Sequence, residues 1–160
     1  MLPEALAGSD LANNINQMAP EAILDAKIAP DGPVIEIAAA HIVPVCRYLR
    51  ESGFERVSGI TGVDWWPRAP RFEVVYLLHS VSRNERLRLT VRLLEDEEID
   101  SVTSIWRGAN WYEREVFDLF GVRFRNHPNL ERIMMPADWE GYPLRKDYPV
   151  HGHKYSYQDE

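Results

Sequence analysis

Five side chains in the last quarter of the chain are of types that could hold a metal ion. They are three histidines and two acids: His127, Asp138, Glu140, His151 and His153. A hydrolase could use such a set to activate a water molecule. Their spacing argues against this chemistry, because no two histidines stand four residues apart on a predicted helix, as a zinc-protease motif requires. A metal-dependent hydrolase is therefore kept as the least favoured of three alternatives.

Charged residues also gather on a predicted helix over residues 111–120. Projected at about 100° per residue, its apolar face takes Tyr112, Val116, Leu119 and Phe120, with Glu113 and Glu115 on the flanks. The opposite side carries Trp111, Arg114 and Asp118, and the last two are spaced for an i,i+4 ion pair. This pattern is typical of a solvated face, but Trp and Arg are also frequent interface anchors. Both interpretations stay open on the helix alone.

The segment after Gly121 combines prolines with large apolar and charged residues. Pro128, Pro136, Pro143 and Pro149 block regular helix and central strand. The backbone groups of such a segment need partners outside regular secondary structure. We expect those partners on another protein surface, which favours a subunit over a self-contained enzyme.

Composition bounds the function classes. The 160 residues are 45% hydrophobic and 27% charged, which is ordinary for a globular domain. The net charge of −7 argues against nucleic acid as a partner. The single cysteine, Cys46, excludes an internal disulfide or an iron–sulfur cluster held by this chain alone. No apolar run is long enough to cross a bilayer, and the first residues lack signal-peptide features, so we expect the chain to stay where it is made.

Hydrophobic periodicity predicts the secondary structure. Helices are expected after Asp10, after Pro20 and over residues 41–52 and 101–120, with Gly108 able to divide the last one. Strands are expected over Val34–Ala38, Phe54–Val63, Phe72–His79 and Leu87–Leu94. The last two alternate apolar and polar residues and form a hairpin.

These elements predict an α+β fold, a two-layer mixed β-sheet with helices packed on one face, plus an extended, Pro-containing C-terminal arm. The globular domain is expected over residues 1–125, with 1–19 loosely ordered, and the arm over 126–160 as an element that docks on other subunits. The sequence SGITG at 58–62 matches neither a dinucleotide nor a P-loop pattern. We therefore assign this chain no catalytic residue and no nucleotide.

Two stretches carry a recognisable signature. WYEREVFDLFGVRFRNHPNLERI (111–133) and DWEGYPLRKDYP (138–149) closely resemble the 30 kDa subunit family of respiratory complex I, the proton-translocating NADH:quinone oxidoreductase. The first stretch alone is also similar to the equivalent subunits of energy-converting hydrogenase and formate hydrogenlyase complexes. A subunit of that kind is the second alternative.

The resemblance implies a non-redox subunit of the peripheral arm, which supports assembly and the quinone-site subunit while the complex transfers electrons from NADH to quinone. FMN and iron–sulfur clusters are then expected in partner subunits and none in this chain. The partners implied are the subunit that forms the quinone site and neighbouring iron–sulfur subunits. The expected location is the cytoplasmic face of the cell inner membrane, reached through the complex and not through a segment of this chain.

The resemblance also points to the residues that contact partners, and it assigns no residue to catalysis, cofactor or metal. The predicted partner-binding set is Trp111, Glu113, Arg114, Glu115, Asp118, His127, Pro128, Arg132, Asp138, Trp139, Glu140, Gly141, Tyr142, Pro143, Leu144, Arg145, Lys146 and Asp147. Within it, Glu113, Arg114, Glu115 and Asp118 are expected to hold the root of the arm to the globular domain or to a neighbour.

Overall fold

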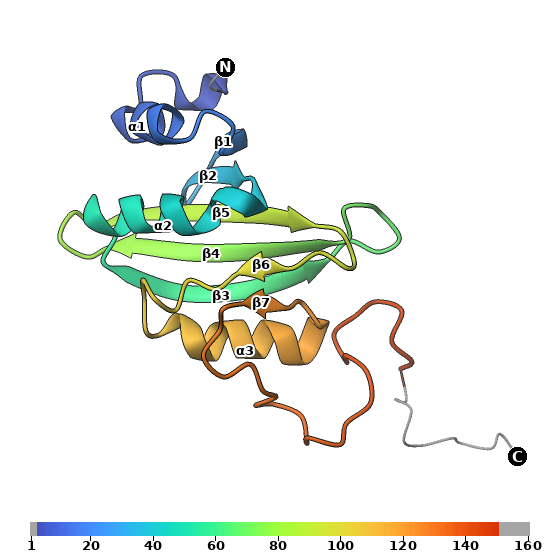
Figure 1. Ribbon diagram of the computed structural model, residues 1–160. Helices are drawn as coiled ribbons and strands as arrows, with labels where there is room; N and C mark the ends of the chain where they lie inside the picture. The colour runs from blue at the N-terminus through green and yellow to red at the C-terminus, as the bar shows by residue number, and fades with distance from the viewer. Residues whose placement is uncertain (1–2, 151–160) are drawn as a thin grey trace, which may run out of the picture.

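The computed structural model describes residues 3–150. Its elements in chain order are η1 (Glu4–Leu6), α1 (Asp10–Met18), β1 (Ile23–Ala29), β2 (Gly32–Ile37), η2 (Ala39–His41), α2 (Ile42–Glu51), β3 (Arg56–Asp64), β4 (Phe72–Ser80), β5 (Glu85–Leu93), β6 (Ile99–Asp100), α3 (Ala109–Phe120) and β7 (Phe124–Arg125). Figure 1 shows strands β1 to β5 side by side in one sheet, with α1 at one end and α3 at the other. The predicted α+β class is confirmed.

The main sheet has five strands in the order β1-β2-β5-β4-β3. Three of its pairings are antiparallel and β2–β5 is parallel, so the sheet is mixed, as predicted. The β4–β5 hairpin runs in unbroken register from Phe72 opposite Leu93 to Ser80 opposite Glu85. A separate parallel pair, β6–β7, ties the segment before α3 to the segment after it.

Strict alternation builds the core on one face of this sheet. In β4 and β5 the buried apolar residues of the core cluster are Phe72, Val74, Tyr76, Leu78, Leu87, Leu89, Val91 and Leu93, and Val75 is buried on the opposite face. Helix α2 adds Ile42, Val45, Cys46 and Leu49 to the same core cluster. The other face of the sheet carries polar and partly exposed residues such as Glu73, Leu77 and Arg88. The period of two therefore separates a packed face from an open one.

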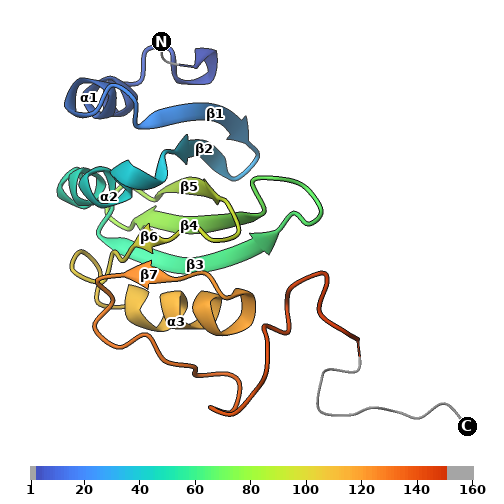
Figure 2. The same ribbon diagram turned by 45° about the vertical axis from the view of Figure 1, so that its right-hand side comes forward.

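Helix α3 packs along β3, at the edge of the sheet (Figure 2). Gly62 of β3 lies opposite the buried Val74, so it faces the core. A Cβ atom at Gly62 would stand 2.8 Å from Cδ2 of Phe120. Close approach of helix and strand therefore requires glycine at this position.

We expect Gly62→Ala to lower the free energy of unfolding by about 1–3 kcal/mol, because the added methyl overpacks the contact with Phe120. Gly59→Ala is the matched control in the same strand, since its Cβ would meet Leu77 at an ordinary 3.6 Å. Urea unfolding of both variants measures the effect. Equal stabilities for the two variants would contradict the packing argument.

Two predicted helices are wrong in place or type. Residues after Pro20 form strand β1 and not a helix. Their spacing resembles that of a helix, because the half-buried residues recur at every third position and a bulge between Ile23 and Asp25 breaks the strand alternation. The last helix begins at Ala109, with Gly108 as its N-cap, so residues 101–108 form turns. The buried Val102, Ile105 and Trp106 produce helical spacing there without a helix.

Helix α1 lies where a short helix was predicted, but its cap is Ser9, whose hydroxyl accepts from the Ala12 N–H, and not Asp10. Ala12 and Ile15 are fully buried. Within residues 3–150, no helix is long and apolar enough to span a membrane.

Candidate functional site

The candidate site consists of α3 and the C-terminal segment, here residues 126–150, which contains neither helix nor strand. The segment leaves β7 and loops around α3 (Figure 2). Its backbone groups were expected to find partners on another protein. In the structure, many of them bind α3 and the core of the same chain, so that expectation is corrected for the groups described below.

Asp118 is the first attachment point. This carboxylate is fully buried, and its Oδ2 accepts backbone N–H groups from Ile133, Met134 and Met135 at 3.0, 2.6 and 2.9 Å. Its Oδ1 accepts from Arg132 Nη1 at 2.9 Å. Burial opposes ionisation, but these donors outweigh it and hold the pKa of Asp118 below its usual value. The carboxylate is therefore a charged clamp on the segment.

The predicted Arg114–Asp118 pair is not formed among residues 3–150. Asp118 pairs with Arg132 instead, while Arg114 donates from Nε to the Glu131 carbonyl and stacks 5.0 Å from the centre of the Trp111 ring. Glu113 was placed on a flank of the helix, but it is fully buried. Both side chains of the i,i+4 pair are therefore bound to the C-terminal segment and not to each other.

The last carbonyls of α3 form a second contact with the segment. The carbonyl of Asp118 accepts from Arg132, that of Leu119 from the Leu144 N–H, and that of Phe120 from Arg145 Nε at 2.6 Å. Such carbonyls have no partner within a helix, and cations are favourable beside them. The segment therefore caps the C-terminal end of α3.

Close packing accompanies this cap. Gly121 ends α3 in the left-handed region, with a φ of 81°. A Cβ there would stand 2.6 Å from both Tyr142 and Arg145. The Arg145 guanidinium lies between aromatic rings, 5.0 Å from the centre of Phe72 and 4.6 Å from that of Tyr142.

Asp64 and Arg71 form a buried ion pair that the sequence analysis missed. Arg71 donates from Nε and Nη2 to the two oxygens of Asp64, each at 3.0 Å, and their side chains are 7% and 1% exposed. Arg71 also bonds Asp147 at 2.5 Å, and the Lys146 N–H donates to Asp64. The pair therefore fixes the far end of the segment to the end of β3.

A third buried acid, Glu113, joins α3 to the loop before it. It accepts from the Ser101 hydroxyl at 2.6 Å and from the Val102 N–H at 2.7 Å. His127 lies beside it, its Nε2 3.8 Å from Glu113 Oε2. His127 Nδ1 accepts from the Asn129 N–H, so Nε2 carries the proton and donates to the Asn110 carbonyl at 3.2 Å.

Burial raises the pKa of Glu113 from 4.5 to about 7, although its two donors act in the opposite direction. Between these values the folded chain keeps a proton that the unfolded chain has released. The free energy of unfolding therefore falls as pH rises through this window, by about 3 kcal/mol in total. Glu113→Gln resembles the protonated form, and we expect it to remove this contribution.

The measurement is urea unfolding of wild type and Glu113→Gln at about pH 5 and about pH 8. The difference between the two proteins reports Glu113 together with its coupling to His127, whose pKa is lowered by burial and whose own slope has the opposite sign. Glu115→Gln, at an exposed position of the same helix, should leave the wild-type profile unchanged. The idea fails if Glu113→Gln keeps the wild-type slope.

The predicted partner-binding residues differ in what they contact. Some contact their own chain through side-chain hydrogen bonds or ion pairs: Glu113, Arg114, Asp118, His127, Arg132, Arg145 and Asp147. Largely exposed positions are Trp111, Glu115, Pro128, Asp138, Glu140, Leu144, Lys146 and, despite its bond to Arg71, Asp147. Trp139, Gly141, Tyr142 and Pro143 are half-buried. Contact of this set with partner subunits stays a prediction.

The metal-site alternative finds no support in the part of the chain that the structure describes. Residues 3–150 contain no group of three or more His, Cys, Asp and Glu side chains placed to hold a metal ion. His127 is engaged by Asn110 and Asn129. His151 and His153 lie outside the described residues.

Solved structures give the class of this fold. One is a chain of the membrane-bound sulfane sulfur reductase, an archaeal respiratory membrane complex, with 30% identity, a TM-score of 0.74 and coverage of 90% of this chain and 86% of the other. Another is a trypsin-resistant fragment of Nqo5, with 28% identity, a TM-score of 0.64 and coverage of 75% and 98%. The fold is thus that of a respiratory-complex subunit.

Sequence comparison gives the particular family. Residues 35–154 match the family model described as respiratory-chain NADH dehydrogenase, 30 Kd subunit. The C subunit of the NADH-quinone oxidoreductase of Hyphomonas neptunium is 43% identical over 91% of this chain and 73% of its own, and that of Geobacter sulfurreducens is 45% identical over 81% and 82%. The chain belongs to this 30 kDa subunit family, as the two signature stretches indicated.

Proposed function

We propose that the chain is the 30 kDa subunit of a proton-translocating NADH:quinone oxidoreductase and acts there as a non-redox structural subunit of the peripheral arm. Family membership is the observation that carries this proposal. The chain supports assembly and the quinone-site subunit, beside neighbouring iron–sulfur subunits. The chain influences electron transfer from NADH to quinone only by allowing the complex to assemble. FMN and the iron–sulfur clusters are held by partner subunits.

The chemistry of its thiol supports a non-redox role. The single cysteine of the 160 residues, Cys46, is fully buried among core side chains. Burial, with a smaller contribution from Glu113, raises the pKa of its thiol far above the usual value. A thiol of this kind is neither a metal ligand nor a nucleophile at neutral pH.

The C-terminal segment supports a docking role. We propose that residues 126–160 form an extended arm that lies on partner subunits, with residues 1–125 as the globular domain. The attachments at Asp118 and Arg71 hold residues 132–135 and 146–147 of this arm before any partner binds, and such preorganisation lowers the entropy cost of association. Trp111, Met134 and Leu144 are 62%, 61% and 52% exposed there and offer apolar contact area.

The second candidate is the equivalent subunit of an energy-converting hydrogenase or a related complex. The likeness to a chain of the sulfane sulfur reductase complex favours it. The relatives at 43–45% identity carry the name of an NADH-quinone oxidoreductase, which favours the first candidate. In either complex, we propose that the chain lies at the cytoplasmic face of the inner membrane and is held there by its partners.

Affinity purification of the tagged chain from native membranes tests the proposal. We expect the quinone-site subunit and iron–sulfur subunits among the co-purifying chains. Co-purification of hydrogenase subunits would support the second candidate instead. Recovery of the chain alone, or of a metal-dependent hydrolase activity in the lone chain, would refute both.

The same purification tests the exposed surface. Trp111→Ala should weaken capture of the quinone-site subunit by about 2 kcal/mol, since an exposed Trp stacked by Arg is a typical interface anchor. Leu24→Ala is the control, because Leu24 is 58% exposed on β1, at the opposite edge of the sheet from α3. Equal capture by the two variants would remove Trp111 from the docking surface.

A further inference from the structure

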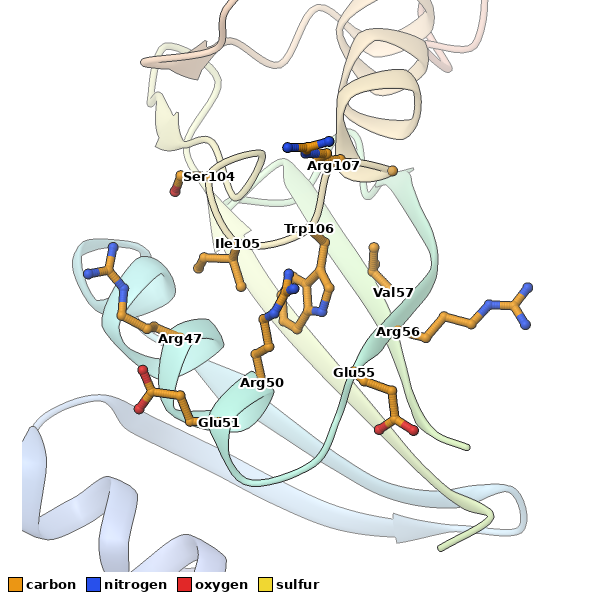
Figure 3. Close-up of a pocket in the computed structure, with 11 residues that line it drawn as sticks. Arg47, Arg50, Glu51, Glu55, Arg56, Val57, Ser104, Ile105, Trp106 and Arg107 are labelled. Carbon is orange, nitrogen blue, oxygen red and sulfur yellow. The ribbon is translucent and has the colours of Figure 1, made fainter. Parts of the chain in front are cut away.

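A cavity lies on the side of the molecule formed by α2, the start of β3 and the loop before α3. Its volume is about 740 Å³, and none of the predicted partner-binding residues lines it. Figure 3 shows Arg47 and Arg50 rising from α2, and Arg107 across from them on the loop. Trp106 and Ile105 lie between these arginines and are 3% and 6% exposed. The cavity therefore has an apolar floor and a basic rim.

The arginines of this rim form no ion pair in the part of the chain that the structure describes. Within residues 3–150, Arg47, Arg50 and Arg107 make no ion pair and no hydrogen bond, whereas Arg71 and Arg132 are held by buried carboxylates. All three are exposed, and they gather in a protein whose net charge is −7. Grouped like charges repel, so an anionic partner at this place would be stabilising.

The acids that line the cavity do not supply that partner. Glu55 is engaged elsewhere, since its Oε1 accepts the N–H groups of Val81 and Ser82 at 3.0 and 3.2 Å. Glu51 lies on α2 and forms no ion pair with these arginines in the described part of the chain. The rim therefore remains available to carboxylates from outside.

We propose that this cavity, here called the Arg50 cleft, binds an acidic segment of a partner polypeptide. The inference rests on the proposed function, because it requires a multisubunit complex. Guanidinium groups bind carboxylates in a two-pronged geometry. The floor of Trp106 and Ile105 suits apolar side chains between the acids of a peptide, and a small inorganic anion would leave that floor uncovered. The volume of about 740 Å³ is in the range of pockets that hold ligands larger than a simple inorganic anion.

The test uses zero-length coupling in the purified complex. An Arg50→Lys variant places an amine in the cleft, and a carbodiimide joins an amine only to a carboxylate in direct contact. We expect an amide between position 50 and an Asp or Glu of another subunit, located by mass spectrometry. Arg68→Lys is the control, since Arg68 is exposed in the β3–β4 loop away from the cleft.

The outcomes separate the two proposals. If the chain co-purifies with the complex but position 50 couples only to Glu51 or Glu55, the cleft proposal fails while the proposed function stands. If the chain does not co-purify with the complex, the proposed function fails, and the cleft proposal, which requires that complex, fails with it. Adding Arg107→Glu to Arg50→Lys should abolish the coupling between subunits. Absence of any amide between position 50 and another subunit, in a complex that contains the chain, would overturn the peptide proposal.

Discussion

Replacing Asp118 with asparagine is expected to lower the free energy of unfolding by about 3–5 kcal/mol, the cost of removing one partner from a buried ion pair. Both carboxylate oxygens are used, Oδ2 by three backbone N–H groups and Oδ1 by Arg132. An asparagine has one acceptor oxygen and one donor amide. In either orientation, that amide faces donors, and buried groups lose their partner.

The effect should concentrate in the C-terminal segment. Residues 132–135 lose their attachment to α3, so limited proteolysis should cut within 126–150 far faster than in wild type. Glu115→Gln is the matched control, because it removes the same charge from an exposed position of the same helix. An Asp118→Asn protein with the stability and cleavage pattern of Glu115→Gln would show that the segment is held by other contacts.

The parts of the fold that the sequence predicted well are those set by local pattern. Strands were predicted over Phe72–His79 and Leu87–Leu94, and the structure has Phe72–Ser80 and Glu85–Leu93. In both strands the core-facing residues recur at every second position, and the sequence shows this period of two. Strand β1 lacks that period, because it lies at the sheet edge and only every third residue is half-buried. Its spacing therefore imitates a helix.

The candidate site was located by its motif, but its contacts were not predictable. Projection of an isolated helix gave Asp118 the partner four residues away, whereas its true partner, Arg132, is 14 residues away. Asp64 had no predicted role, because the groups it holds include the N–H of Lys146, which is 82 residues away. The sequence shows which residues are charged and which segments alternate between apolar and polar residues. It does not show which distant segment will cover a carboxylate.

The second large effect is expected at Arg71. Its guanidinium lies among three carboxylates, with bonds of 3.0 Å to Asp64, 2.5 Å to Asp147 and 2.9 Å to Glu95. Arg71→Met should cost about 3–5 kcal/mol at neutral pH, because it leaves the buried Asp64 without its counter-charge. Arg68→Met, in the same loop but exposed, should cost little. Urea unfolding of both variants measures the difference.

The pH dependence of this cost distinguishes the lost charge from lost packing. The pKa of Asp64 is lowered because Arg71, with the Lys146 and Trp66 N–H groups, outweighs its burial, and Arg71 likewise lowers the pKa of Asp147. Their contribution to wild-type stability is therefore present at neutral pH and is lost as pH falls below their ordinary pKa of 3.8. In Arg71→Met, the Asp64 carboxylate remains buried but has lost the guanidinium. Its pKa therefore rises, and protonation at low pH removes the cost of the unpaired buried charge.

The gap in stability between wild type and Arg71→Met should consequently narrow as pH falls towards about 4. A gap caused only by the missing side-chain volume would stay constant, because burial of methylene groups does not depend on pH. The same experiment on Asp64→Asn should show a smaller cost than Arg71→Met, since Arg71 then keeps Glu95 and Asp147 as counter-charges and no buried charge is left unpaired. A constant gap would assign Arg71 a packing role and leave Asp118 as the charge-dependent attachment of the C-terminal segment.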